Sequence, residues 1–434
     1  MKLRTQIPAV CAVIAAMSLS ACAPGSPSSP SSEAATAPSS VDFNSFKGQT
    51  LTYVYFTDGP DEQATKDAIA KFEAATGAQV NLQIVPFANL ATSLQARLSA
   101  SNAPEVARVA DWHPYADQEI DFKQYFGSNY PSEFTQGAAS TAIDPAGHML
   151  AVPSDTTING PMINVDAFKK AGVEVPTKWT WDELVADAKK VAAANNMQYS
   201  VAIDKSGHRL STLLSQFGTV MIGPDGKNAL DKDKATKALT FFTDLVKSNT
   251  APKDFWLGSG SKYSGANEIF LAGQVPVYLS GPWQVGAFTK NATFNWAAVP
   301  NPCAERCGGF PGGKFMIAFK NSKNPTLAAA FVQWMNRTEN QGEVDKTAYW
   351  LPTRQDLTTS GVQYPSRGSD MNVFLSQVNT TPADTWTDAN SPAFTSSATA
   401  LIAETDKVVA GQEDIPTAVN NLSAAIDKAI KAAP

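Results

Sequence analysis

The chain has 434 residues, of which 43% are hydrophobic, and a formal net charge of −6 at pH 7. This length is too great for a single hydrophobic core, so we expect two lobes. The acidic balance and the lack of a basic tract argue against binding to nucleic acid and against electrostatic docking to anionic lipid.

The first 21 residues have the pattern of a secretory signal segment. Lys2 and Arg4 precede a mostly apolar stretch at 7–19, which is shorter than the roughly 20 residues that span a bilayer. The tetrapeptide LSAC at 19–22 then resembles a bacterial lipobox. This resemblance implies cleavage before Cys22 and acylation of that cysteine, which would anchor the protein to the outer face of the cell membrane. An ordinary secretory signal that is cleaved nearby is the alternative.

Residues 22–45 are expected to form a disordered tether. Ser, Pro, Ala and Thr dominate this segment, so it cannot bury enough apolar surface to fold. No later apolar run is long enough to span a membrane.

Two cysteines remain after the signal segment and Cys22 are set aside. Cys303 and Cys307 are close in sequence, and in an oxidising compartment a disulfide between them is the natural interpretation. A metal site would need two more ligands, and none of the three histidines stands at ligand spacing to another. We therefore expect neither a metal nor another cofactor.

The first third of the folded part alternates strands with helices. Strands are predicted at 51–56, 80–85 and 104–109, and helices at 61–75 and around Leu90, Leu94 and Leu98. This alternation predicts a parallel sheet with helices on both faces. Ligands bind such sheets at the carboxyl ends of the strands, which directs attention to Asp58, Asp111 and Trp112.

The stretch at 151–191 predicts a strand, a polar turn at 154–157, a second strand and two helices. Thr180 and Glu183 form a capping box, which marks the start of the second helix. Further along the chain, the apolar patterns predict helices at 235–247, 266–272, 324–335 and 415–432, and strands at 274–279, 294–299 and 315–319.

Three local phrases resemble one known family. They are INVDAFKKAG at 163–172 with WTWDEL at 179–184, FLAGQVPVYLSGPW at 270–283, and WLPTR at 350–354. These phrases are similar to those of the extracellular solute-binding proteins of ABC sugar importers, the maltose-binding-like family. Ile163 stands where this family usually has tyrosine, which is a small departure.

The resemblance implies an α/β, two-lobe periplasmic-binding-protein-like fold. Each lobe would be a mostly parallel sheet flanked by helices, with the ligand in a cleft between the lobes. The N-terminal lobe would comprise 46–153 plus 314–367, and the C-terminal lobe 154–313 plus 368–434. The chain would cross between the lobes near 153–156, 309–315 and 365–372.

The implied function is that of a binding protein and not of an enzyme. It would capture a neutral mono- or oligosaccharide by hinge closure and deliver it to the permease subunits of an ABC transporter. We expect the protein to be a monomer.

Sugars present C–H patches and hydroxyl groups, so aromatic rings and carboxylates are the matching side chains. On position and resemblance, the expected ligand-binding residues are Asp58, Asp111, Trp112, Asp155, Trp283, Phe310, Trp350, Arg354 and Trp386. Trp283 matches the family's sugar-stacking aromatic. For Asp155, replacement by alanine is expected to weaken binding without unfolding the lobes.

Two alternatives remain open. The same fold could bind another polar solute such as a glycerophosphodiester, although a phosphate favours clustered arginines and only Arg354 is suggestively placed. A surface lipoprotein hydrolase is the other alternative. The glycine–serine cluster around Ser259 lacks the Gly-x-Ser-x-Gly pattern, however, and the near match to a P-loop at 308–314 is followed by Phe315 instead of Ser or Thr.

Overall fold

The computed structural model describes residues 43–58 and 60–433, which all lie in one compact unit at 37–434. The expected signal segment, Cys22 and nearly all of the tether fall outside the described residues. Within the described part, every helix is too short or too polar to cross a membrane.

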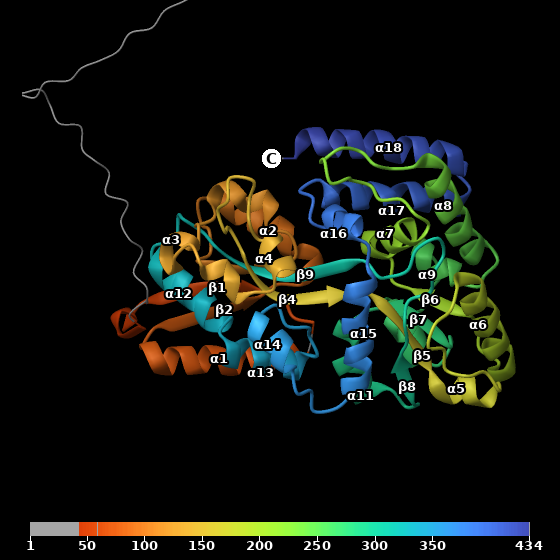
Figure 1. Ribbon diagram of the computed structural model, residues 1–434, viewed down its shortest axis with the longest axis horizontal. Coiled ribbons are helices and arrows are strands. Elements are labelled where there is room, and N and C mark those ends of the chain that lie inside the picture. Colours follow the sequence, from red (N-terminus) through yellow and green to blue (C-terminus); the bar gives the residue numbers. More distant parts are fainter. Residues whose placement is uncertain (1–42, 59, 434) are drawn as a thin grey trace, which may run out of the picture. The chain divides into compact units, whose positions relative to one another are not determined.

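Two separate β-sheets organise the described residues (Figure 1). The first has the strand order β2-β1-β3-β9-β4. Its strands are β1 (Thr50–Tyr55), β2 (Gln79–Ile84), β3 (Val106–Val109), β4 (Val152–Ile158) and β9 (Pro311–Ala318). Strand β1 pairs in parallel with β2 and β3, whereas β9 runs antiparallel to both β3 and β4.

The second sheet has the strand order β6-β7-β5-β8. Its strands are β5 (Gly160–Asn164), β6 (Val201–Ile203), β7 (Val277–Ser280) and β8 (Trp296–Ala298). Only β6 and β7 pair in parallel among these described strands, and β5 is antiparallel to both of its neighbours. The α/β fold with two mostly parallel sheets is as expected. Each sheet contains one strand that runs opposite to the others, β9 in the first sheet and β5 in the second.

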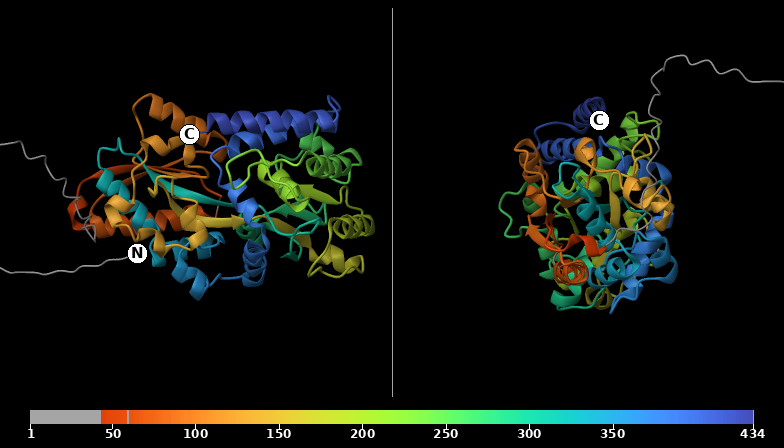
Figure 2. Two further views of the ribbon diagram at one scale, coloured as in Figure 1. Left: turned by 45° about the horizontal axis from the view of Figure 1, so that its top comes forward. Right: turned by 90° about the vertical axis from the view of Figure 1, so that its left-hand side faces the viewer.

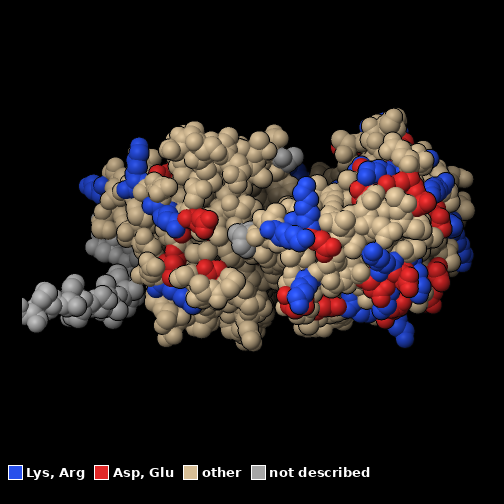
Figure 3. All heavy atoms as spheres, turned by 90° about the horizontal axis from the view of Figure 1, so that it is seen from above, with Lys and Arg blue, Asp and Glu red and all other residues tan. Residues whose placement is uncertain are grey.

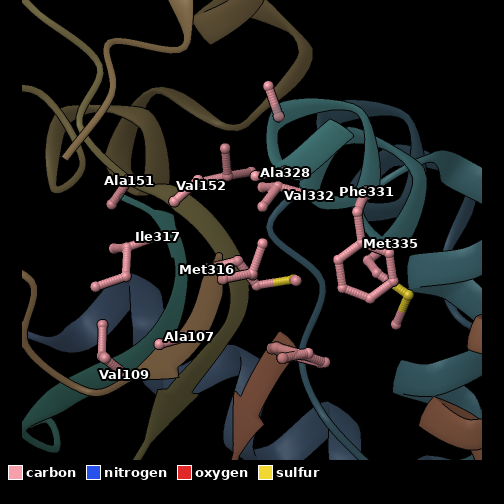
Figure 4. Close-up of a cluster of buried hydrophobic side chains, with 14 of the residues drawn as sticks. Ala107, Val109, Ala151, Val152, Met316, Ile317, Ala328, Phe331, Val332 and Met335 are labelled. Carbon is pink, nitrogen blue, oxygen red and sulfur yellow. The ribbon is translucent and has the colours of Figure 1, made fainter. Parts of the chain in front are cut away.

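We call the first sheet and the elements that share its core the first lobe. Its helices are α1 (Asp61–Thr76), α2 (Phe87–Ser99), α3 (Lys123–Phe126), α4 (Gln136–Ser140), α12 (Pro325–Met335), α13 (Thr338–Ala348) and α14 (Gln355–Ser360), with the 3-10 helices η1 (Phe43–Phe46), η2 (His113–Gln118) and η3 (Tyr130–Glu133). Strands β3, β4 and β9 pack against the apolar face of α12 (Figure 4). There Met316 of β9 and Phe331 of α12 are almost completely buried, so this contact is part of the core of the lobe.

The second lobe is the four-stranded sheet with the elements packed on it. Its helices are α5 (Val165–Lys170), α6 (Trp181–Asn195), α7 (Gly207–Gln216), α8 (Lys232–Lys247), α9 (Lys253–Leu257), α10 (Ala266–Leu271), α11 (Val285–Asn291), α15 (Gly368–Thr380), α16 (Ala383–Ala389), α17 (Phe394–Ala410) and α18 (Ile415–Ala432), with the 3-10 helix η4 (Pro282–Gln284). The long helices α17 and α18 lie side by side in all views and share the core that also contains α7 and α8 (Figures 1 and 2).

Strands β4 and β9 connect the two lobes. The polar turn expected at 154–157 is absent, because these residues belong to β4 and pair with β9, Asp155 opposite Lys314 and Thr157 opposite Gly312. A register shift between Pro153 and Asp155 interrupts this ladder. Polar side chains therefore occupy a strand here, which pairs with β9 through its backbone and buries the side chains of Asp155 and Thr157.

Several predicted boundaries agree closely with the structure. The Thr180 hydroxyl accepts a hydrogen bond from the Glu183 backbone N–H, and the Glu183 carboxylate accepts one from the Thr180 N–H, so α6 has the expected capping box. Helix α18 spans Ile415–Ala432, as its apolar spacing predicts. Helical periodicity with clear caps is thus readable in this chain.

The expected disulfide between Cys303 and Cys307 is present. It closes a loop that is anchored by Arg306, whose guanidinium donates to the Ser215 carbonyl at 2.7 Å and pairs with Asp384. A closed loop this short is worth about 2 kcal/mol in the chain-entropy account of disulfides.

Replacing both Cys303 and Cys307 by alanine should therefore lower the free energy of unfolding by about 2 kcal/mol, measured by urea denaturation. Dithiothreitol provides the control, because it should destabilise the wild type by a similar amount and leave the double variant unchanged. A loss in the variant that dithiothreitol does not reproduce in the wild type would point to lost side-chain packing instead of lost cross-linking.

Candidate ligand-binding cleft

A cleft of about 500 Å³ lies between the two lobes. The first lobe contributes the segments that follow β1 and β3 and the start of α2, and the second lobe contributes the start of α7, Trp283 and the segment from α16 into α17. Strands β4 and β9 cross its floor. In Figure 3, which looks down on the top of Figure 1, the surface is hollowed between the two lobes. This size suits a small organic ligand.

The rule that ligands bind at the carboxyl ends of strands, which we call the strand-end rule, locates part of this cleft correctly. Asp58 follows β1 and Asp111 follows β3, and both line the cleft with partly exposed side chains. Of the nine residues expected to bind ligand, those that line the cleft are Asp58, Asp111, Trp112, Asp155, Trp283, Phe310 and Trp386.

Three of these residues are almost completely buried. Trp112, Asp155 and Phe310 each expose only 2% of their surface. The indole N–H of Trp112 donates to the Thr141 carbonyl at 2.8 Å, and its ring stacks on His113. These side chains therefore shape the walls of the cleft more than they offer groups to a ligand.

Asp155 belongs to a buried ionic cluster centred on Arg108. The Arg108 guanidinium lies 3.1 Å from the Asp155 carboxylate and 3.4 Å from that of Asp58, and it donates to the Phe56 carbonyl at 2.8 Å. Asp61 lies 3.9 Å from it, and burial raises the pKa of Asp61 although Arg108 opposes the shift. Because the Asp155 carboxylate pairs with Arg108, replacing Asp155 should lower the free energy of unfolding. The sequence alone predicts a loss of binding without a loss of stability.

Trp350 and Arg354 do not line the cleft. The Arg108 guanidinium lies 4.2 Å from the centre of the Trp350 ring, which borders a separate cavity of about 30 Å³ behind the cluster. Arg354 pairs with Glu133 at 2.8 Å and with Asp356 at 3.1 Å. The sequence predicts that Trp350 and Arg354 contact the ligand. In the structure neither faces the cleft, because both make their contacts inside the first lobe.

One side-chain hydrogen bond joins the two walls of the cleft directly. The Thr395 hydroxyl, in α17 of the second lobe, donates to the Asp111 carboxylate of the first lobe at 2.8 Å. The other carboxylate oxygen accepts from the His113 backbone N–H at 3.1 Å and lies 2.8 Å from the His113 Nδ1. Asp111 therefore connects the lobes as well as facing the cleft.

The second-lobe wall is built around the start of α7. Ser206 caps this helix by accepting a hydrogen bond from the Arg209 backbone N–H, and the Arg209 guanidinium lies 4.5 Å from the centre of the Trp283 ring. The Asp204 carboxylate lies 3.5 Å from the Arg209 guanidinium and also accepts hydrogen bonds from Tyr278 and Ser280. Trp283 is half-buried, so only part of its ring is available for stacking.

Sequence reasoning missed several residues that line the cleft. They are aromatic or basic residues from both lobes and from β9: Phe87, His113, His208, Arg209, Lys314 and Phe315. Phe87 follows β2, and His208 with Arg209 follows β6. The strand-end rule, applied to these two strands as well, would have indicated these three residues.

Two α/β lobes that enclose a cleft and are connected by crossing strands define a two-lobe ligand-binding protein. The model of the family described as bacterial extracellular solute-binding protein matches residues 57–342. The chain belongs to this family, and it is therefore a solute-binding protein and not an enzyme, which removes the hydrolase alternative.

Individual relatives are distant. The chain is 23% identical to the maltotriose-binding protein of Pyrococcus abyssi over 66% of this chain and 62% of that protein. It is 24% identical to the sn-glycerol-3-phosphate-binding periplasmic protein UgpB of Salmonella typhimurium, over 71% of this chain and 76% of the relative. The maltose-bound structure of T. maritima MalE3 superimposes with a TM-score of 0.77 at 18% identity, covering 88% of this chain and all of that one. At this identity the structural likeness establishes the fold alone.

Proposed function

We propose that this protein is the carbohydrate-binding component of an ABC importer, which captures a mono- or oligosaccharide in the cleft and delivers it to the permease. The observation that carries the proposal is a cleft of about 500 Å³ with aromatic side chains and hydrogen-bonding groups on walls from both lobes. Aromatic rings match the C–H faces of sugars, and polar groups match their hydroxyls. The family membership and the sugar-binding relative support the same class of ligand.

Capture works by closure of the lobes about β4 and β9. A ligand that touches both walls binds the closed state more tightly than the open one, and about 5.5 kcal/mol of difference converts a mostly open population into a mostly closed one. The lobe boundaries that we propose are 46–153 plus 314–367 and 154–313 plus 368–434. The hydrophobic clusters support this division in part. They keep Met316 with the first sheet and Phe374 with the second, but they also place Tyr349 and Leu351 with the second sheet.

The protein acts on the outer face of the membrane, held there by acylated Cys22 and a tether at 22–45. The lipobox-like tetrapeptide at 19–22 and the Ser/Pro/Ala-rich composition that follows support this placement. A long tether lets the binding protein reach the permease while it stays anchored.

Calorimetry and tryptophan fluorescence against a sugar panel test the proposal. The panel contains glucose, galactose and mannose together with maltose, maltotriose, maltotetraose and mannotriose. Saturable binding of at least one sugar is expected, with a change in the fluorescence of Trp283 or Trp386 because both line the cleft. Absence of binding to every sugar in the panel would refute the carbohydrate proposal.

A second candidate keeps the fold and changes the solute to a glycerophosphodiester. Arg354 does not line the cleft, so it cannot bind the phosphate of such a ligand. Lys314 and Arg209 do line the cleft, and the Lys314 ammonium has no carboxylate partner among the described residues. Basic side chains beside a helix start can bind phosphate. Glycerophosphocholine therefore belongs in the same panel, and saturable binding of it alone would favour this candidate.

A further inference from the structure

The two walls of the cleft differ in chemistry. Phe87, Ala91, Ala110 and Pro114 are the exposed cleft-lining residues at the ends of β2 and β3 in the first lobe, and all four are apolar. The carboxylates beside them also have protein partners, Asp58 in Arg108 and Asp111 in Thr395. The fully exposed part of the first-lobe wall is therefore apolar, and the polar groups beside it, including His113 and Thr141, are only partly exposed.

The opposite wall combines polar and aromatic groups. From the second lobe, Ser206, His208, Asn390, Ser391 and Thr395 line the cleft with partly or fully exposed side chains, together with the partly exposed rings of Trp283 and Trp386. A ligand that satisfies both walls has hydroxyl groups for the polar side chains and apolar faces for the aromatic rings. A chain of sugar rings meets this requirement better than a single ring, because its successive C–H faces form a longer apolar surface.

Phe87 is the most prominent apolar group on the first-lobe wall. It exposes 58% of its surface, more than any other large hydrophobic side chain in the described part of the chain. Its ring centre lies 4.9 Å from that of Phe56, which is almost completely buried and lies under the Arg108 guanidinium. Phe87 is also the first residue of α2, directly after Pro86, whose ring restricts the backbone at the helix start. The Phe87 ring therefore packs against a buried aromatic ring and remains exposed to the cleft.

We propose that Phe87 forms a second sugar subsite, so that the ligand is an oligosaccharide of at least two rings and not a monosaccharide. One ring lies deep in the cleft near Trp283, and the next lies with its C–H face on Phe87. This inference rests on the proposed function and adds the length of the ligand and the residue that selects for it. Single exposed apolar residues are common on protein surfaces. Phe87 differs from these because it lines the ligand cleft and rests on a buried ring.

Calorimetry with glucose, maltose, maltotriose, mannose and mannotriose on the wild type and the Phe87→Ala variant tests the subsite. The wild type should bind a trisaccharide more tightly than the matching monosaccharide. Loss of the apolar area on the Phe87 ring should weaken trisaccharide binding about tenfold and leave monosaccharide binding within about twofold. Phe87→Tyr keeps the ring, so it should stay within about threefold of the wild type for both sugar lengths.

Leu375→Ala provides the matched control. Leu375 is a large apolar side chain that is 39% exposed on α15 and does not line the cleft, so its removal should change no affinity. Thermal denaturation of each variant shows whether lost folding contributes. Equal weakening for mono- and trisaccharide, or no weakening for either, would overturn the Phe87 subsite while leaving carbohydrate binding intact. A wild type that binds none of the sugars would instead refute the proposed function.

Discussion

Replacing Arg108 by methionine is expected to lower the free energy of unfolding by about 3–5 kcal/mol, the largest stability effect that the structure predicts for a single charged residue. Arg108 is 1% exposed and faces the carboxylates of Asp155, Asp58 and Asp61. Methionine fills a similar volume but supplies neither charge nor hydrogen bonds. The variant therefore keeps two fully buried carboxylates, those of Asp61 and Asp155, without their cation.

Urea denaturation of purified protein measures the loss, and Lys66→Met provides the control. Lys66 pairs with Glu62 on the surface, with side chains that are 47% and 37% exposed, so its removal should change stability by no more than about 0.5 kcal/mol. Arg108→Lys should fall between the two, because it keeps the charge but cannot reproduce the fork that reaches both Asp155 and the Phe56 carbonyl. Similar losses for Lys66→Met and Arg108→Met would contradict a special role for the buried cluster.

The pH dependence of Arg108→Met gives an independent check of the cause. Burial raises the pKa of Asp61 in the wild type, and Arg108 is the main group that opposes this shift. Without Arg108, the folded-state pKa of Asp61 should rise further above that of the unfolded chain, so the variant should lose more stability than the wild type as the pH rises above the unfolded value near 4. Lowering the pH from about 8 to about 5 should therefore restore part of the loss in the variant and none in Lys66→Met. A loss that is independent of pH would indicate packing and not charge.

The Arg108 cluster could not be predicted from the sequence, whereas part of the cleft could. The rule that ligands meet the ends of parallel strands located Asp58 and Asp111 at the cleft correctly. Nothing in the sequence indicates, however, that Arg108, in the middle of an apolar strand, turns inward to engage Asp155, which is 47 residues away. Long-range pairing of this kind depends on how β3 and β4 flank β9, and single-sequence patterns do not report strand order.

Features that depend on neighbouring residues are predicted from the sequence better than features that depend on tertiary contacts. The capping box at Thr180 and the spacing in α18 are properties of neighbouring residues, and both predictions are confirmed. The polar turn predicted at 154–157 is wrong, because a Ser-Asp-Thr-Thr run is typical of turns when it is isolated, but here it is paired with β9. Trp350 and Arg354 were misplaced for a related reason, since a family phrase identifies a segment without showing which way its side chains face.

Replacing Thr395 by valine is expected to weaken binding of the preferred sugar about tenfold with little change in thermal stability. The Thr395 hydroxyl donates to the Asp111 carboxylate at 2.8 Å and so joins the second-lobe wall to the first. Hydrogen bonds to charged groups contribute about 1.5–3 kcal/mol, and here that energy favours the closed arrangement of the lobes. A smaller closed population raises the apparent dissociation constant in proportion. Valine keeps the volume of the side chain, and Thr395 is exposed, so the core of α17 is undisturbed.

Calorimetry measures the affinity, and small-angle X-ray scattering without ligand should give a larger radius of gyration for Thr395→Val than for the wild type. Thr399→Val is the matched control, because Thr399 lies one turn further along α17, is exposed, and bonds only to the Thr395 carbonyl of its own helix. It should leave affinity and scattering unchanged. Asp111→Ala should weaken binding more than Thr395→Val, since it removes the contact to Thr395 and a carboxylate that faces the cleft. Tighter sugar binding by Thr395→Val would contradict the stabilising role, because it would mean that the hydroxyl competes with the ligand for Asp111 and must be displaced before the sugar can bind.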